Sequence, residues 1–155
     1  MIDRIKEFFS QFIEPGLHGG DAAAPALQVA TAALLLEMMR MDDTITGAEM
    51  EAIRTTLQGH FALEDHQLKT LLELAAAESR EASGYHPFTS LINRHADYAQ
   101  KVRIIEHLWH VAMIDGHLDA HELHLMRKLA DLLHVGQADY LAAKQRARQS
   151  ANLPA

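Results

Sequence analysis

The sequence contains no cysteine, which excludes disulfide bonds and metal sites built on thiolate ligands. Val, Ile and Tyr, which favour strands, are few, whereas Ala, Leu, Met, Glu and Gln are plentiful. The latter residues favour helices, and no segment alternates apolar and polar residues with a period of two. The composition therefore predicts an all-α fold.

Long hydrophobic runs are also missing. The nearest approach to 18 consecutive apolar residues, over residues 22–41, is interrupted by Gln28, Thr31, Glu37 and Arg40. No transmembrane helix is therefore expected. Residues 1–9 carry charges where a secretory signal would need an apolar core. Together with the lack of cysteine, these features predict a soluble, cytoplasmic protein.

Positive charge is in short supply as well. Lys and Arg number 14 against 21 Asp and Glu, so the formal net charge is −7 with neutral His. Nucleic-acid binding needs clustered Lys and Arg, and this balance argues against a nucleic-acid partner. With 48% hydrophobic residues, a chain of 155 residues suffices for one domain with a substantial core.

A short acidic pattern occurs twice in the chain. In each copy an Asp ends an apolar run, an aliphatic residue follows three positions later, and a Glu follows seven positions later. The two copies are Asp42, Ile45 and Glu49, and then Asp115, Leu118 and Glu122, each 73 positions further on. Recurrence of a pattern at one offset indicates a tandem duplication.

We expect about eight helices in a single domain that spans residues 1–155. An N-terminal amphipathic helix and loop would occupy residues 1–20, a first repeat residues 23–83, and a second repeat residues 88–150. Each repeat offers one helix that is apolar nearly all round and two amphipathic helices, and a short helix over residues 88–95 connects the two halves. Neither half can cover its own apolar surface. The halves should therefore pack through these two central buried helices, related by a pseudo-twofold axis.

Two of the expected helices, over residues 46–58 and 64–83, are predicted to be joined by a linker at residues 59–61. The first of them begins with Thr46 and Glu49, and a later helix begins with Asp119 and Glu122. Both pairs fit a capping box, in which the Glu at the third helical position accepts the backbone N–H of the cap residue. The two glutamates therefore have a structural explanation.

Asp42 and Asp115 end helices, where the dipole disfavours negative charge, so each needs backbone N–H groups of the turn or a bound cation. The segment from Asp115 to Glu122 matches positions 5–12 of an EF-hand loop. Positions 1 and 3, however, would be Val111 and Met113, which offer no side-chain oxygen. A structural turn and a divalent-cation site therefore both stay open. The residues of such a site would be Asp42, Glu49, Asp115 and Glu122.

Histidine is abundant, with 11 in the chain. His121 and His124 are spaced i, i+3 on an expected helix, a spacing that suits zinc, nickel or cobalt, and His117 extends the set if that helix begins early. His107 and His110 form another i, i+3 pair, and at least one of them is expected to be a hydrogen-bonded histidine at the edge of the core. The first group is either a set of exposed polar side chains or the metal site of a His/carboxylate hydrolase.

The two repeats of a buried helix, an acidic turn and a capped helix resemble the TerB-like family, named for bacterial tellurite-resistance clusters. The motifs that carry the resemblance are Asp42…Ile45…Glu49 and Asp115-Gly116-x-Leu118…Glu122. The resemblance covers residues 25–150. The first copy departs from the pattern, because Asp43 stands where the second copy has Gly116.

Membership of this family would imply an all-α bacterial protein of the cytoplasm, with a non-enzymatic role linked to metal or oxyanion stress. It would also imply protein partners, some of them at the membrane. The suspected cation site of the family maps here to Asp42, Glu49, Asp115 and Glu122. Two alternatives stay open. One is the hydrolase that uses His117, His121 and His124, and the other is a peripheral membrane-associated scaffold anchored by Phe8, Phe9 and Phe12.

Overall fold

The computed structural model describes residues 24–40, 47–81, 84–114 and 120–150. The helices are α2 (Ala24–Arg40), α3 (Gly47–Phe61), α4 (Asp65–Glu81), α5 (His86–His95), α6 (Tyr98–Ala112), α7 (Ala120–Leu132) and α8 (Gln137–Ser150). Within the described ranges there are seven helices and no strand, which confirms the all-α class. The expected helix and loop at residues 1–20 lie outside these ranges, so the count of eight stays a prediction.

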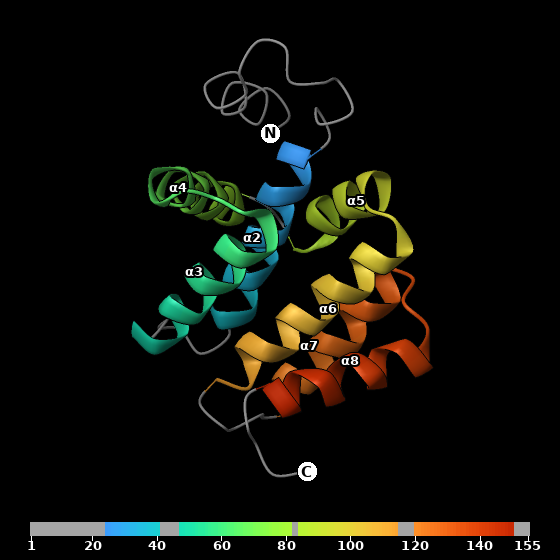
Figure 1. Cartoon of the computed structure of the whole chain (residues 1–155). Helices are drawn as coiled ribbons and strands as arrows, with labels where there is room; N and C mark the ends of the chain where they lie inside the picture. The colour runs from blue at the N-terminus through green and yellow to red at the C-terminus, as the bar shows by residue number, and fades with distance from the viewer. Residues whose placement is uncertain (1–23, 41–46, 82–83, 115–119, 151–155) are drawn as a thin grey trace.

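Helix α2 runs through the middle of the molecule, with α3 and α4 on one side and α6, α7 and α8 on the other (Figure 1). From Leu27 to Met39 every side chain except Gln28 and Glu37 is buried. The hydroxyl of Thr31 donates to a backbone carbonyl one turn earlier, at 2.8 Å, so no polar group of this side chain is left unsatisfied in the core. A helix of this composition is buried all round because α3, α4, α5 and α6 all pack against it.

Helix α6 is the central helix of the second half, and only one of its faces is buried. The buried residues are Ile104, Ile105, Leu108, Trp109, Val111 and Ala112. The opposite face carries Arg103, which is exposed, and Glu106 and His107, which are half-buried. The expectation of an apolar surface nearly all round is therefore met by α2 and not by α6. Charged and polar side chains on α6 need water or a polar neighbour.

The neighbours of the two central helices correspond. Helix α2 packs against α3 and most extensively against α4, while α6 packs against α7 and most extensively against α8. The central helices also contact each other, and α3 contacts α6. Helix α5 packs against α2 and so covers a further face of the first half. This arrangement agrees with a duplicated unit. The pseudo-twofold axis and the division into segments 1–20, 23–83 and 88–150 stay predictions.

The expected linker at residues 59–61 is wrong, because this stretch forms the last turn of α3. The helix ends at Phe61. The next residue, Ala62, has a left-handed φ of +53°, and the N–H of Leu63 donates to the carbonyl of Gln58 at 3.2 Å. This is the hydrogen bond of a Schellman C-cap. Gly59 is tolerated inside the helix because tertiary packing outweighs its helix-propensity penalty of about 1 kcal/mol.

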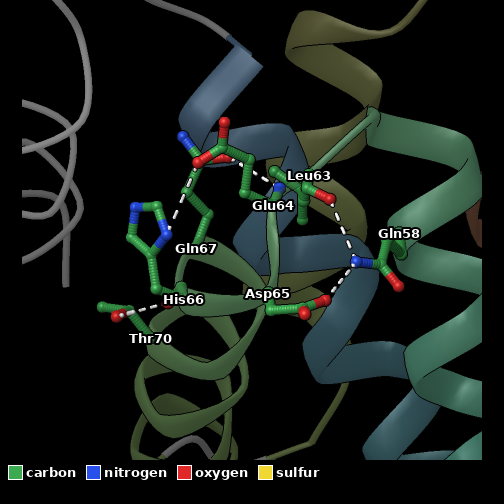
Figure 2. Close-up of polar contacts among 7 residues, drawn as sticks. All are labelled: Gln58, Leu63, Glu64, Asp65, His66, Gln67 and Thr70. Carbon is green, nitrogen blue, oxygen red and sulfur yellow. Dashed lines mark hydrogen bonds and ion pairs between the residues drawn. The ribbon is translucent and has the colours of Figure 1, made fainter.

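Side chains hold the junction between α3 and α4 (Figure 2). The Nε2 of Gln58 donates to the carbonyl of Leu63 at 3.2 Å and to Oδ1 of Asp65 at 2.8 Å. The backbone N–H of Glu64 donates to Oε1 of Gln67 at 2.9 Å. These bonds satisfy backbone groups that have no partner within a helix, and they fix where the last turn of α3 lies.

The second half contains a matching C-cap and a complete capping box. Helix α7 is followed by His134, whose φ is +60°, and the N–H of Val135 donates to the carbonyl of Ala130 at 2.9 Å. Asp97 caps the start of α6: its side chain accepts the N–H of Gln100 at 2.8 Å, while the Gln100 side chain accepts the N–H of Asp97 at 2.9 Å. Local signals therefore set the start of α6 and the end of α7.

Candidate functional site

The two acidic turns are described only at their helical ends. Glu49 and Glu122 are the third residues of α3 and α7, and they are 6% and 4% exposed. Neither is without an interaction partner. The third helical position is the one that a capping box assigns to its Glu. Asp42, Asp115 and the two expected cap residues lie outside the described residues.

Two carboxylates are thus buried at equivalent positions of the two halves. A buried carboxylate is unfavourable unless hydrogen bonds, a helix N-terminus or a cation compensates its charge. Each of these glutamates lies in the first turn of its helix, where the dipole favours negative charge. Carboxylate oxygens are also the ligands that calcium and magnesium prefer. The described part of each turn fits both of the predicted roles.

The histidines predicted as a metal set are not brought together with a third ligand. His121 and His124 are both exposed on α7, and His117 lies outside the described residues. Among the residues that the structure describes, no group of three or more His, Asp or Glu is placed to hold a metal ion. His117, His121 and His124 therefore stay a prediction as a set.

A cavity of about 350 Å³ lies between α3, α6 and α8. Its lining includes His60 from α3, four residues of α6 and Ser150 from α8; the four are Arg103, Glu106, His107 and His110. The i, i+3 spacing on α6 pointed to two of these histidines. His60 could not be recognised as their neighbour, because it was assigned to a linker and stands 47 positions before His107.

His60 and His107 are in direct contact. The Nδ1 of His60 is 2.8 Å from the Nε2 of His107, and the two rings meet edge to face with their centroids 4.6 Å apart. One facing nitrogen must carry the hydrogen and the other the lone pair, so at least one ring is neutral. This hydrogen bond links the first half of the molecule to the second. It also confirms the expectation of a hydrogen-bonded histidine on α6.

The environment keeps both rings neutral near pH 7. Burial lowers the pKa of His60, and the charge of Arg103 lowers it further. Burial likewise lowers the pKa of His107 to about 4, with smaller contributions from the charges of His60, His110 and Arg103. A neutral imidazole retains a nitrogen lone pair that can accept a hydrogen bond or bind a metal.

Polar contacts between α6 and α8 border a second cavity, of about 500 Å³. The hydroxyl of Tyr98 donates to Oδ2 of Asp139 at 2.6 Å and accepts the N–H of Gly136 at 3.0 Å. The Nε of Arg146 lies 2.5 Å from Oε1 of Glu106. The hydrogen bond to Asp139 is the main cause that raises the pKa of Tyr98. These side chains interact with one another, so their role here is to hold α6 against α8.

The alternative of a membrane-associated scaffold depended on Phe8, Phe9 and Phe12, which lie outside the described residues. Of the helices that the structure describes, none has the length and apolar character required to cross a bilayer. Peripheral association through these aromatic side chains therefore stays a prediction.

Comparison with known proteins supports the resemblance seen in the acidic motifs. No curated protein and no solved structure gives a match. Residues 28–145 match the family described as "Tellurite resistance protein TerB". The match begins in α2 and ends in α8, so it includes both halves of the fold. Because the matched segment makes up most of the 155 residues, the chain belongs to the TerB family.

Proposed function

We propose that this protein is a non-enzymatic TerB module that binds a divalent cation at its acidic turns and acts through a protein partner in metal or tellurite stress. The cation would be held by carboxylates from both halves: Asp42, Glu49, Asp115 and Glu122. The observation that carries the proposal is the burial of Glu49 and Glu122 at equivalent positions.

Burial favours a role beyond capping. A glutamate can cap a helix at the surface, where water shares the solvation of its charge, whereas a buried glutamate loses most of that hydration. The N-terminus of a helix compensates by about half an elementary charge. Each glutamate also has an interaction partner within the chain. A divalent cation shared between two turns would add to this compensation, and it would gain the oxygen ligands that one half-loop lacks.

Exposed aliphatic side chains support the partner role. Ile114 and Leu123, which flank the second acidic turn, are 37% and 38% exposed. Met50, the counterpart of Leu123 in the first half, instead packs against the core. Apolar side chains beside a cation-binding turn would give a partner a surface that responds to the ion. The second turn is therefore the better candidate for contact with a partner.

Isothermal titration calorimetry tests the cation site. Metal-stripped protein is titrated with Ca²⁺, Mg²⁺ and Mn²⁺, and the double variant Asp115→Asn plus Glu122→Gln is expected to lose binding. The matched control is Glu51→Gln plus Asp131→Asn, which removes the same charge from exposed positions of α3 and α7. Equal affinity in the two double variants, or no binding by the wild type, would contradict the proposal.

The hydrolase alternative is not proposed. A catalytic metal site needs about three protein ligands and an open coordination position. His121 and His124 are exposed on α7, and no third ligand joins them within the described part of the chain.

A further inference from the structure

We propose a second metal site, at which a divalent transition-metal ion such as Zn²⁺ or Cu²⁺ is held between Nδ1 of His60 and Nε2 of His107. The site lies in the cavity between α3, α6 and α8. It goes beyond the cation site proposed at the acidic turns, because it uses different residues and a different ligand chemistry. Imidazole nitrogen suits zinc, copper and nickel, whereas calcium and magnesium prefer oxygen.

The geometry of the histidine pair is close to that of a metal site. The two facing nitrogens are 2.8 Å apart. Two nitrogens bound to a tetrahedral zinc, with Zn–N bonds of roughly 2.0–2.1 Å, are separated by roughly 3.3 Å. The two nitrogens would therefore have to move apart by about half an ångström, and each ring would have to turn so that its lone pair points at the ion. The two ligands come from helices that already contact each other, so little order has to be created on binding.

The protonation state of the pair also suits a metal. Both pKa values are lowered, so protons do not compete strongly for the nitrogens near neutral pH. In the hydrogen-bonded pair one facing nitrogen carries a hydrogen. On metal binding that hydrogen leaves to water, and the other nitrogen of the same ring takes up a proton. Each facing nitrogen then gives its lone pair to the metal, and no net proton is released.

The charges around the pair are mixed. The positive charge of Arg103 lowers the pKa of both histidines and so works against a cation, whereas Glu106, which lines the same cavity, is paired with Arg146. The neutral histidine pair adds no positive charge of its own, and its facing nitrogens offer lone pairs once the shared hydrogen has left. Within the described residues no third His, Asp or Glu is in place, so water would fill the other coordination positions. The cavity, at about 350 Å³, has room for such waters.

The test uses the metal-stripped full chain and Zn²⁺, titrated by calorimetry at pH 7. His60→Gln and His107→Gln are each expected to weaken Zn²⁺ binding about tenfold or more, since each removes one of two protein ligands. The matched control, His66→Gln plus His86→Gln, removes two exposed histidines that belong to neither candidate metal site and should leave the affinity unchanged. With Cu²⁺, the nitrogen hyperfine pattern in the electron paramagnetic resonance spectrum should change from that of two nitrogen ligands to that of one in either single variant.

Folding of each variant is checked by circular dichroism and by the metal-free melting temperature. His60 and His107 lie on different helices, so His60→Gln alone still tests the site if His107→Gln fails to fold. Absence of Zn²⁺ binding in the wild type, or equal binding by the wild type and His60→Gln, would overturn the proposal. Loss of Zn²⁺ binding in Asp115→Asn plus Glu122→Gln would also overturn it, because the ion would then lie at the acidic turn.

Discussion

The two halves of the protein carry the same acidic pattern, but their central helices differ in what surrounds them. Three polar residues of α6 stand 73 positions after three buried apolar residues of α2: Arg103, Glu106 and His107 after Ala30, Ala33 and Leu34. Helix α5 packs against α2 in the first half, whereas this face of α6 borders the histidine cavity. Equivalent positions in a duplicated sequence therefore need not have equivalent environments, since burial depends on every element packed around them.

The helix ends of the two halves are more alike than their central helices. Helices α3 and α7 both finish in a Schellman C-cap with a left-handed residue that is not glycine, Ala62 in one and His134 in the other. An apolar residue follows each, Leu63 and Val135. Because these caps depend on contacts within about six residues, duplication reproduces them more easily than it reproduces long-range packing.

The largest expected effect comes from the core, to which both central helices contribute a leucine at equivalent positions. Leu35 and Leu108 are 73 positions apart and both are fully buried. Leu35→Ala and Leu108→Ala should each lower the free energy of unfolding by about 2–5 kcal/mol, because each leaves a cavity. Urea denaturation measures both losses. A loss below about 1 kcal/mol in one half only would show that the two cores are not equivalent.

The next largest effect is a loss of stability at low pH, and it arises from His107 at the contact between the two halves. An unfolded His has a pKa of 6.5, whereas that of His107 in the fold is about 4, so the unfolded state binds more protons between these values. The stability contribution is fully present above pH 6.5 and is lost as the pH falls towards 4. After allowance for the partial exposure of the ring, we expect a loss of about 2 kcal/mol.

This pH dependence is tested by replacing His107 with the residue that stands at the equivalent position of the first half. His107→Leu copies the first half, where Leu34 stands at the equivalent position, and should flatten the fall in stability between pH 6.5 and 4. Chemical denaturation at a series of pH values is the measurement. His124→Gln, at an exposed position of α7, is the control and should retain the full pH dependence.

The two C-caps should respond alike to glycine. Ala62→Gly and His134→Gly each relieve a left-handed conformation, and we expect a gain of about 0.5–1 kcal/mol after the greater flexibility of glycine in the unfolded chain is subtracted. Ala142→Gly, within α8, is the matched control and should lose about 1 kcal/mol. Thermal denaturation would reveal a difference between the halves if only one cap gained stability.

The smallest effect is expected at the ion pair between Arg146 and Glu106. The first half has no counterpart, because the equivalent residues are Glu73 and Ala33. The two side chains are 48% and 30% exposed, so Arg146→Gln should lower stability by less than about 1 kcal/mol. The difference from the wild type should shrink further at high salt. Melting curves at two ionic strengths measure it, and a loss above about 2 kcal/mol would mean that the pair organises α8.

The sequence by itself determined the helices and the family. The helix expected at residues 64–83 is found at Asp65–Glu81, and the later helix with Glu122 in its first turn is found at Ala120–Leu132. Their boundaries depend on capping residues and on a period of 3.6 residues, which are local signals. The duplicated acidic motif likewise sufficed to indicate the TerB family, because it is a short and repeated pattern.

Only the tertiary structure decided the environment of the histidines. Gly59 made residues 59–61 look like a linker, yet packing keeps them helical and brings His60 to His107, 47 positions away. The neutral state of this pair depends on burial and on the charge of Arg103. Hydrogen-bond partners, pKa values and cavities arise from contacts between distant segments. A local pattern carries no information about such contacts until the helices are packed.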